Sequence, residues 1–385
     1  MALPDIQLSL RPGIVEFGWG HPDAALLPTA DLARAATYAL ETAGAEALAY
    51  GAEQGPGRLI EAIRQRLAQT EGDVPPEDHF LISGGISQAL EMLCVQLTRP
   101  GDVVLVGEPS YHLAQKIFRD HGLQLVGVPS DAQGLHVEAI DALLTMLRRR
   151  GERVALVYHV PTFNNPSGAT LTPDRRYALA ALARREGLLM IEDDAYAELW
   201  YDAPPPPPVY NFAPGGPIIR LGSFAKSLAP GLRLGWVQAD PQIVQRCVAG
   251  GLLDSGGGVN HFTAHVAAAF FELDLYAAHV QRLRAAYGER RNVLLAALAR
   301  YLPPTCQWQP ALGGFFIWIR LPEQLDTAKL LPAAEAAGVA YLPGARFFPA
   351  GGGHNYLRLS FSLLPPDELE LGARRLGDLV RREYS

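Results

Sequence analysis

The chain has 385 residues, of which 49% are hydrophobic and 19% charged, and its formal net charge is −7. These values exclude a disordered protein and a single small domain, and they favour a large α/β unit with a smaller unit beside it. The negative charge argues against nucleic acid as the main partner, because a phosphate backbone is normally bound by a basic surface. We therefore expect any binding of a phosphate group to be local.

The cysteines and the first residues indicate a protein of the cytoplasm. Cys94, Cys247 and Cys306 are widely spaced, without a CxxC pair, and are expected to be reduced thiols in the core. Residues 1–13 lack a basic region followed by an apolar run, and no apolar stretch approaches the length of a membrane span. We expect neither secretion nor membrane insertion.

The first predicted elements are an arm and two helices. Residues 1–30 are rich in Pro and Gly and are expected to form an extended arm. A helix is predicted from Asp31, as N-cap, to about Thr42. A second, amphipathic helix is predicted around residues 59–67, where apolar residues recur at helical spacing.

From residue 80 onward, short apolar strands alternate with helices. Within each strand the residues are almost all apolar and do not alternate between apolar and polar. This pattern indicates a mostly parallel sheet covered on both faces. In such a sheet, ligands bind beyond the carboxyl ends of the strands. The seven predicted strands are residues 80–83, 103–107, 124–128, 154–159, 188–192, 217–221 and 234–238. The helices predicted between them are residues 87–97, 111–122, 137–149 and 173–186.

The second half of the chain predicts a smaller unit. The proline run 204–208 is expected to be a stiff surface loop. A long helical region, 261–301, leads into this unit, and the domain boundary is placed within it. We expect an arm (1–30) that packs with the small domain and the functional site, a large domain (31–280) and a small domain (281–385). The elements predicted in the small domain are residues 314–321, 326–337, 340–342, 356–362 and 366–383.

Residues 221–236 are the strongest candidate for the chemistry, because they contain Lys226 in a chain whose basic residues are nearly all arginine. An arginine cannot form an imine, whereas a lysine can be desolvated, deprotonated and condensed with an aldehyde. Ser223 and Arg233 add a hydroxyl and a guanidinium that suit a small phosphorylated aldehyde. Taken alone, the same pattern also fits a solvated surface lysine.

Four further motifs have both a structural and a functional interpretation. The glycine turn in residues 83–90 opens a helix whose free amides attract an anion. Asn165 lies in an Asn-Pro-x-Gly turn. Residues 192–194 are three consecutive carboxylates, which repel one another and therefore need a positively charged partner or a solvent-exposed position. Arg358 lies in an apolar strand and needs an anion, which is either an internal carboxylate or a ligand's.

The order and spacing of these motifs resemble those of fold-type I pyridoxal-phosphate (PLP) enzymes. The resemblance is specifically to class I/II aminotransferases of the branch with aminoadipate aminotransferases and MocR-like regulators. Ser-Phe-Ala-Lys-x3-Pro-Gly-x-Arg-x-Gly-Trp is similar to their Schiff-base segment. The resemblance implies the α/β PLP-transferase fold type I, with a mostly parallel seven-stranded sheet between helices and a smaller α+β domain. It covers nearly the whole chain and rests on Asn165, Asp193, Tyr196, Ser223, Lys226, Arg233 and Arg358.

The resemblance implies roles for the residues around the cofactor ring. Lys226 would carry PLP and move the proton, Asp193 would keep the pyridine nitrogen protonated, and Tyr196 would donate to the phenolic oxygen. Asn165 would donate to the same oxygen and border the substrate. Arg358 would bind the α-carboxylate of the amino acid.

The resemblance also implies where the cofactor phosphate binds. Gly85, Ile86 and Ser87 would hold it together with Ser223 and Arg233. The family more often has Ser-Gln where this chain has Ile86-Ser87, a departure that leaves the backbone contacts intact.

Two further positions, Tyr111 and Tyr50, follow from the same resemblance, and Gly20 is expected from its place in the arm. Tyr111 would stack on the pyridine ring, and Gly20 of the arm would border the substrate. Tyr50 resembles the tyrosine that reaches the phosphate in the partner subunit, which implies a homodimer with shared active sites. No metal is expected.

The principal hypothesis is a PLP-dependent aminotransferase that moves an amino group from an L-amino acid to a 2-oxo acid. The resemblance implies that the acceptor is 2-oxoglutarate and that the reaction follows a ping-pong sequence. A second hypothesis keeps the cofactor but predicts β- or γ-elimination. A third is a non-catalytic sensing domain of MocR type, which the acidic composition and the lack of a winged-helix segment disfavour. Aromatic, branched-chain and aminoadipate-like donors all stay open.

Overall fold

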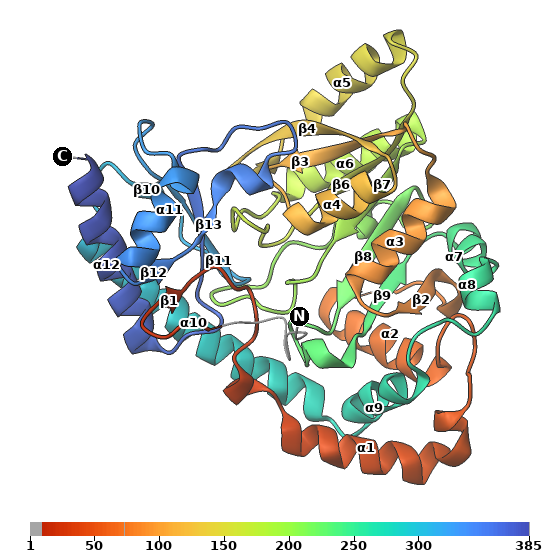
Figure 1. Ribbon diagram of the computed structural model, residues 1–385. Helices are drawn as coiled ribbons and strands as arrows, with labels where there is room; N and C mark the ends of the chain where they lie inside the picture. Colours follow the sequence, from red (N-terminus) through yellow and green to blue (C-terminus); the bar gives the residue numbers. More distant parts are fainter. Residues whose placement is uncertain (1–9, 73, 385) are drawn as a thin grey trace, which may run out of the picture.

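The computed structural model describes residues 10–72 and 74–384 and consists of a large and a smaller unit (Figure 1). The large unit is built on an eight-stranded sheet with the order β2-β9-β8-β7-β6-β3-β4-β5. Strands β8, β7, β6, β3 and β4 are mutually parallel, whereas β9 is antiparallel to both of its neighbours. The strands are β2 (Phe80–Ser83), β3 (Val103–Glu108), β4 (Gln124–Asp131), β5 (Gly134–Leu135), β6 (Val154–His159), β7 (Leu189–Asp193), β8 (Ile218–Ser223) and β9 (Gly235–Gln238).

The sheet confirms the predicted fold class and adds one strand. All seven predicted strands are present, with small shifts at their ends. The eighth, β5, pairs only Gly134 and Leu135 with the end of β4. A strand of two residues is too short to produce an apolar run, so the sequence pattern did not reveal it.

Helices cover both faces of the sheet because alternate strand residues point to opposite faces. Val104 and Val106 pack toward α3, α4 and α7, whereas Val103 and Leu105 pack toward α5 and α6. A third group of helices, α1, α2 and α9, covers the end formed by β2 and β9. The bounds are α1 (Thr29–Ala43), α2 (Gly57–Glu71), α3 (Ile86–Leu97), α4 (His112–Asp120), α5 (Val137–Arg149), α6 (Pro173–Glu186), α7 (Pro241–Val248), α8 (Gly251–Asp254) and α9 (His261–Glu272).

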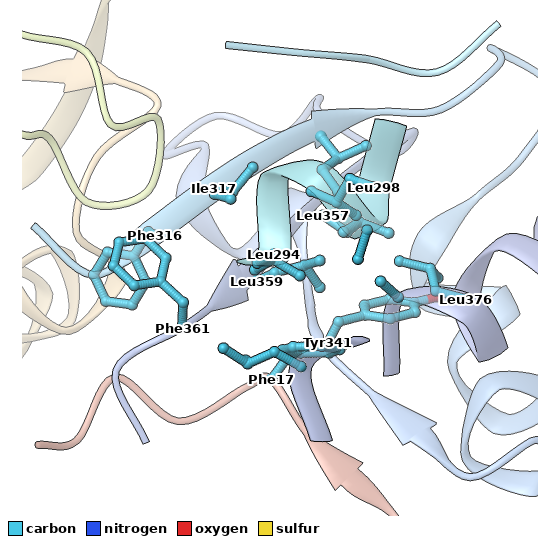
Figure 2. Packing of buried hydrophobic residues seen from close by; sticks show 14 of the residues in the cluster. Phe17, Leu294, Leu298, Phe316, Ile317, Tyr341, Leu357, Leu359, Phe361 and Leu376 are labelled. Atoms are coloured by element: carbon cyan, nitrogen blue, oxygen red, sulfur yellow. The ribbon is translucent and has the colours of Figure 1, made fainter. Parts of the chain in front are cut away.

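The smaller unit has a four-stranded antiparallel sheet with the order β10-β11-β14-β13. Figure 2 shows its core, where Leu294 and Leu298 of α10 pack near Leu357 and Leu359 of β14, with Leu376 of α12 beside them. The elements are α10 (Leu275–Tyr301), β10 (Gln307–Trp308), β11 (Phe316–Arg320), α11 (Thr327–Ala336), β12 (Val339–Ala340), β13 (Leu342–Pro343), β14 (Tyr356–Ser360) and α12 (Pro366–Tyr384).

The arm is tied to the smaller unit. Its strand β1 (Val15–Glu16) pairs in parallel with β12. The next residue, Phe17, is fully buried in the core of Figure 2, close to Tyr341. Arm residues 18–22 then continue toward the large sheet, where they contact residues of the candidate site. Residues 1–9 of the predicted arm lie outside the described residues.

Two helix boundaries differ from or refine the prediction. Helix α1 begins at Thr29 after Pro28, so the prediction of Asp31 as N-cap was wrong. Asp31 instead lies in the first turn, where a carboxylate is favoured by the helix dipole. The long helical region breaks at Asp274, which has a left-handed conformation with φ 56° and precedes α10. The predicted domain boundary at residues 280–281 falls inside α10 and stays a prediction.

The cysteines agree with the expectation of thiols in the core. Cys94, Cys247 and Cys306 are buried and unpaired. Over the described residues, no helix is both long enough and apolar enough to cross a membrane.

Candidate active site

The candidate site lies at the carboxyl ends of the strands of the large sheet. Gly85 follows β2, Lys226 follows β8, Asp193 ends β7, Asn165 follows β6 and Tyr111 follows β3. Apart from the interposed β9, these strands are neighbours in the order β2-β9-β8-β7-β6-β3. The topology therefore gathers at one edge the motifs that the sequence spreads over more than a hundred residues.

The amine of Lys226 lies in a partly buried, positively charged environment. Its Nζ donates a hydrogen bond of 3.0 Å to the carbonyl of Gly20 in the arm. Burial and, to a smaller extent, the charges of Arg358 and Arg233 together lower the pKa of Lys226 to about 8, while Asp193 acts in the opposite direction. This is not the solvated surface lysine that the sequence alone left open. A fraction of the amine is neutral near pH 8 and available as a base or nucleophile.

The three consecutive carboxylates are all buried, which excludes the alternative of a solvated position. Glu192 accepts hydrogen bonds of 2.8 and 3.0 Å from the backbone amides of residues 209–210. Asp194 accepts from the guanidinium of Arg220 at 2.7 Å. These two side chains are engaged by backbone amides and by Arg220, although Oδ1 of Asp194 has no partner among the described residues, whereas Asp193 lies within electrostatic reach of Lys226.

Asp193 ends β7 within electrostatic reach of Lys226. Its Oδ2 accepts a hydrogen bond of 2.6 Å from the hydroxyl of Tyr158. Burial raises the pKa of Asp193 to about 6, while the hydrogen bonds from Tyr158 and the Ala195 amide act in the opposite direction. Asp193 is therefore mostly ionised at neutral pH. The sequence analysis missed Tyr158, since an aromatic residue in an apolar strand is typical of a core.

Arg358 lies on β14 and points its guanidinium toward the large unit. Its Nη1 donates to Oδ1 of Asn165 at 2.8 Å, and its Nη2 donates to the carbonyl of Gly18 at 2.7 Å. The ring of Phe316 lies 4.0 Å from the guanidinium carbon. Nε is buried and has no hydrogen-bond partner in the part of the chain that the structure describes. Among the described residues no carboxylate pairs with Arg358, so the internal anion considered from the sequence is absent there.

Two tyrosines retain their protons beside these groups. Burial raises the pKa of Tyr196 well above its ordinary value, and burial raises the pKa of Tyr111 to about 12. Both hydroxyls therefore stay available as hydrogen-bond donors at neutral pH. The ring of Tyr196 packs edge to face against Phe315 and Phe316, with centroids 5.5 and 5.9 Å apart.

The glycine turn provides a cradle for an anion. Gly85 precedes α3 with φ 94°, a conformation that favours glycine. The amides of Ile86 and Ser87 are in the first turn, where backbone donors have no acceptor within the helix. A Cβ at Gly85 would lie 3.1 Å from Nη2 of Arg233, so this space is narrow and faces a cation.

Ser223 and Arg233 border the same turn. Strand register aligns Ser83, Gly235 and Ser223 across β2, β9 and β8, which places Ser223 at the level of the glycine turn. Among the described residues, Arg233 donates only to backbone carbonyls, at 3.2 Å to residues 84 and 230. Its charge is thus available to an anion.

Tyr50 is the one predicted site residue that lies away from the others. It is 86% exposed, and its ring lies beside Gly256, where a Cβ would approach it to 2.9 Å. No described contact joins Tyr50 to the groups around Lys226. Gly20, in contrast, contacts the site through its carbonyl, and a Cβ there would lie 2.6 Å from the ring of Phe316.

The residues present fit PLP. An ionised carboxylate suits a pyridinium nitrogen, a lysine amine suits the aldehyde, and the glycine turn with Arg233 suits the phosphate. The orphaned Nε of Arg358 adds a buried donor that an external carboxylate would satisfy. Fold and site together define a PLP-dependent enzyme of the α/β class.

Comparison with known proteins identifies the family. Residues 12–376 match the model of "Aminotransferase class I and II", so the chain belongs to this family. A relative from Thermococcus litoralis, "Aromatic-amino-acid aminotransferase 1", is 32% identical and covers 96% of this chain and 88% of its own. "2-aminoadipate transaminase" from Thermus thermophilus is 34% identical, with 98% and 92% covered. The protein is a PLP-dependent aminotransferase.

Solved structures agree with this result. The crystal structure of Pyrococcus horikoshii kynurenine aminotransferase, in complex with PMP, has a TM-score of 0.91 and 31% identity. It covers 97% of this chain and 92% of its own.

Relatives from the regulator branch also match: the HTH-type transcriptional regulator YdfD of Bacillus subtilis is 32% identical over 87% of this chain and 68% of its own length.

Proposed function

We propose that the protein transfers the amino group of an L-amino acid to 2-oxoglutarate in two half-reactions of a ping-pong sequence. The observation that carries the proposal is the Lys226 amine, with a pKa lowered to about 8, within electrostatic reach of Arg358 and Asp193. PLP, when bound, supplies an aldehyde for the amino group and a ring that withdraws electrons from the substrate.

Lys226 is the proposed proton carrier. An amine whose pKa lies near the working pH serves first as general base and then as general acid. It would take the proton from Cα of the amino acid and return it to the reacting carbon of the cofactor. The Gly20 carbonyl, which accepts from Nζ at 3.0 Å, would hold the free amine on the side of the arm.

Asp193, Asn165 and Tyr196 are proposed to hold the cofactor ring. The ionised Asp193 would pair with the ring nitrogen. Because Oδ1 of Asn165 accepts from Arg358, its Nδ2 is the group left to donate to the phenolic oxygen. Tyr196, which keeps its proton, is the second donor to that oxygen. Tyr111 would cover the ring face.

Arg358 is proposed to bind the α-carboxylate. Its guanidinium already donates to Asn165 and Gly18, and the buried Nε remains for the substrate. A carboxylate would also compete with the Gly18 carbonyl, because it carries a negative charge and can accept two parallel hydrogen bonds from the guanidinium.

The phosphate is assigned to the glycine turn. The amides of Gly85, Ile86 and Ser87, the hydroxyl of Ser223 and the guanidinium of Arg233 would hold it. The support for this assignment is the strand register that places Ser223 beside the turn and the absence of a carboxylate partner for Arg233 among the described residues.

The donor is proposed to have an aromatic or large apolar side chain. The cations that act on Lys226 are Arg358 and Arg233, which are assigned above to carboxylate and phosphate. Next to Gly20, the arm brings the rings of Trp19 and His21, which pack edge to face with centroids 5.5 Å apart. The relative from Thermococcus litoralis that is named for aromatic amino acids supports this choice.

The active site is proposed to be shared in a homodimer through Tyr50. A tyrosine that is 86% exposed and lies near the exposed Leu48 is suited to a contact with a second copy. Subunit mixing tests this. Lys226→Ala and Tyr50→Ala proteins, each nearly inactive alone, are expected to regain activity when mixed, since each hybrid dimer would contain one complete site. No recovery would show that Tyr50 does not act across the interface.

The experiment for the reaction itself follows the visible spectrum of PLP-loaded protein while single amino acids are added, followed by 2-oxoglutarate. We expect an aromatic donor to convert the cofactor to pyridoxamine phosphate and yield one 2-oxo acid per subunit, and 2-oxoglutarate to restore the original spectrum. Release of ammonia from a single substrate, with the spectrum unchanged at the end, would instead favour elimination. Absence of any conversion across the panel would contradict the proposed reaction.

A further inference from the structure

Tyr158 is buried beside the candidate site, and the reaction described above gives it no role. It lies on β6, in the centre of the large sheet, and is 0% exposed. The ring of Phe118 from α4 packs edge to face against it, with centroids 5.3 Å apart. The hydroxyl therefore has no access to water and must find its partner within the protein.

The strand register directs this hydroxyl to Asp193. Tyr158 pairs with Ile191 of the parallel strand β7. Asp193 is two residues further along β7, so its side chain points to the same face as that of Ile191. Tyr158 and Asp193 are thus diagonal neighbours on one face, and their side chains meet in a hydrogen bond of 2.6 Å to Oδ2. Such a short bond to a carboxylate is typical of a charge-assisted interaction.

The bond has two physical consequences for Asp193. It fixes Oδ2, so that rotation of the carboxyl group is restricted and Oδ1, which Tyr158 does not contact, can face a ligand. It also stabilises the ionised carboxylate, because a hydroxyl donates to the charged form. Burial raises the pKa of Tyr158 well above its ordinary value, so the hydroxyl remains a donor throughout the working pH range.

We infer that Tyr158 is a positioning residue that holds Asp193 ionised and oriented, so that Oδ1 faces the ring nitrogen of the cofactor. The inference rests on the role of Asp193 in the proposed function. Tyr158 itself touches neither cofactor nor substrate, and its effect must therefore pass through the ring nitrogen. That requirement separates it from a residue that merely stabilises the fold.

The test compares PLP with its carbocyclic analogue, in which a C–H group replaces the ring nitrogen. Dissociation constants of both are measured by equilibrium dialysis for wild type, Tyr158→Phe and the control Tyr210→Phe. The control also loses a buried hydroxyl, one that is 3.0 Å from Nδ1 of His79. We expect Tyr158→Phe to weaken PLP binding by about tenfold, in line with a hydrogen bond to a charged group, and to leave the analogue unchanged.

Equal weakening of both ligands, or of neither, would overturn the inference, as would the same pattern in Tyr210→Phe. Should Tyr158→Phe fail to fold, Tyr158→Leu also lacks the hydroxyl and enters the same comparison. Asp193→Ala separates this inference from the proposed function. If Asp193→Ala keeps the preference for PLP over the analogue, the assigned role of Asp193 fails. If Asp193→Ala loses that preference and Tyr158→Phe retains it, only the role of Tyr158 fails.

Discussion

Replacing Arg358 by glutamine removes one of the two positive charges that depress the pKa of Lys226. With a pKa of about 8, rather than the ordinary 10.5, about 20% of the amine is neutral at a pH of about 7.4. At the ordinary value the neutral fraction would be about 0.1%. The environment thus increases the reactive fraction on the order of 250-fold, and part of that gain depends on Arg358.

The assay is the rate at which cofactor-free protein captures PLP, followed by absorbance in a stopped-flow instrument as a function of pH. Capture requires the neutral amine, so the wild-type rate is expected to rise with a midpoint near pH 8. Arg358→Gln is expected to move the midpoint upward, toward 10.5, and to slow capture at neutral pH. Arg346→Gln is the control, because Arg346 is exposed and is not among the charges that act on Lys226.

Two results would refute this reasoning. A wild-type midpoint near 10.5 would mean that neither burial nor neighbouring charge depresses the pKa of Lys226. A midpoint that stays near 8 in Arg358→Gln would mean that Arg358 is not one of the causes.

Two further predictions concern the cofactor cradle and the fold. Gly85→Ala is expected to weaken PLP binding by about tenfold, because a φ of 94° is strained for alanine. The control Gly57→Ala, at an open position that begins α2, is expected to have no effect. Equal PLP affinities of the two variants in equilibrium dialysis would contradict this prediction. Arg220→Met leaves Asp194 and Glu71 without their buried cation and is expected to lower the free energy of unfolding by about 3–5 kcal/mol. An unchanged urea midpoint would show that this network contributes nothing to stability.

Local patterns predicted much of the large unit because its strands are short, uniformly apolar and separated by helices with clear ends. Helix α6 was predicted with its observed bounds, since Pro173 occupies its first turn and Gly187 ends it in a left-handed conformation. The start of α1 was missed because Asp31 is equally suited to an N-cap and to a first turn. Pro28, the residue that precedes the helix, has no side-chain oxygen with which to cap it, so the sequence pattern pointed to Asp31 instead.

Contacts between distant segments could not be derived from the sequence alone. Arg358 has its carbonyl partner at Gly18, on an arm more than three hundred residues earlier in the chain, and only the tertiary fold brings them together. The family resemblance assigned the contact with the ring nitrogen to Asp193 and not to the carboxylates on either side of it. The reason is visible only in the structure, where Glu192 accepts from two backbone amides and Asp194 pairs with Arg220. No sequence pattern indicated a role for Tyr158, because its contact with Asp193 depends on the register between two strands, which the sequence does not show.

The measurement that tests the central claim most directly locates the bound cofactor on the chain. PLP-loaded protein is treated with borohydride, which makes the bond between cofactor and lysine permanent, and the digested peptides are mapped by mass spectrometry. Besides Lys226 the chain contains only Lys116 and Lys329, both exposed, so the map is unambiguous. We predict one pyridoxyl group per subunit, on Lys226 alone. A group on Lys116 or Lys329, or none on Lys226, would contradict the site described here.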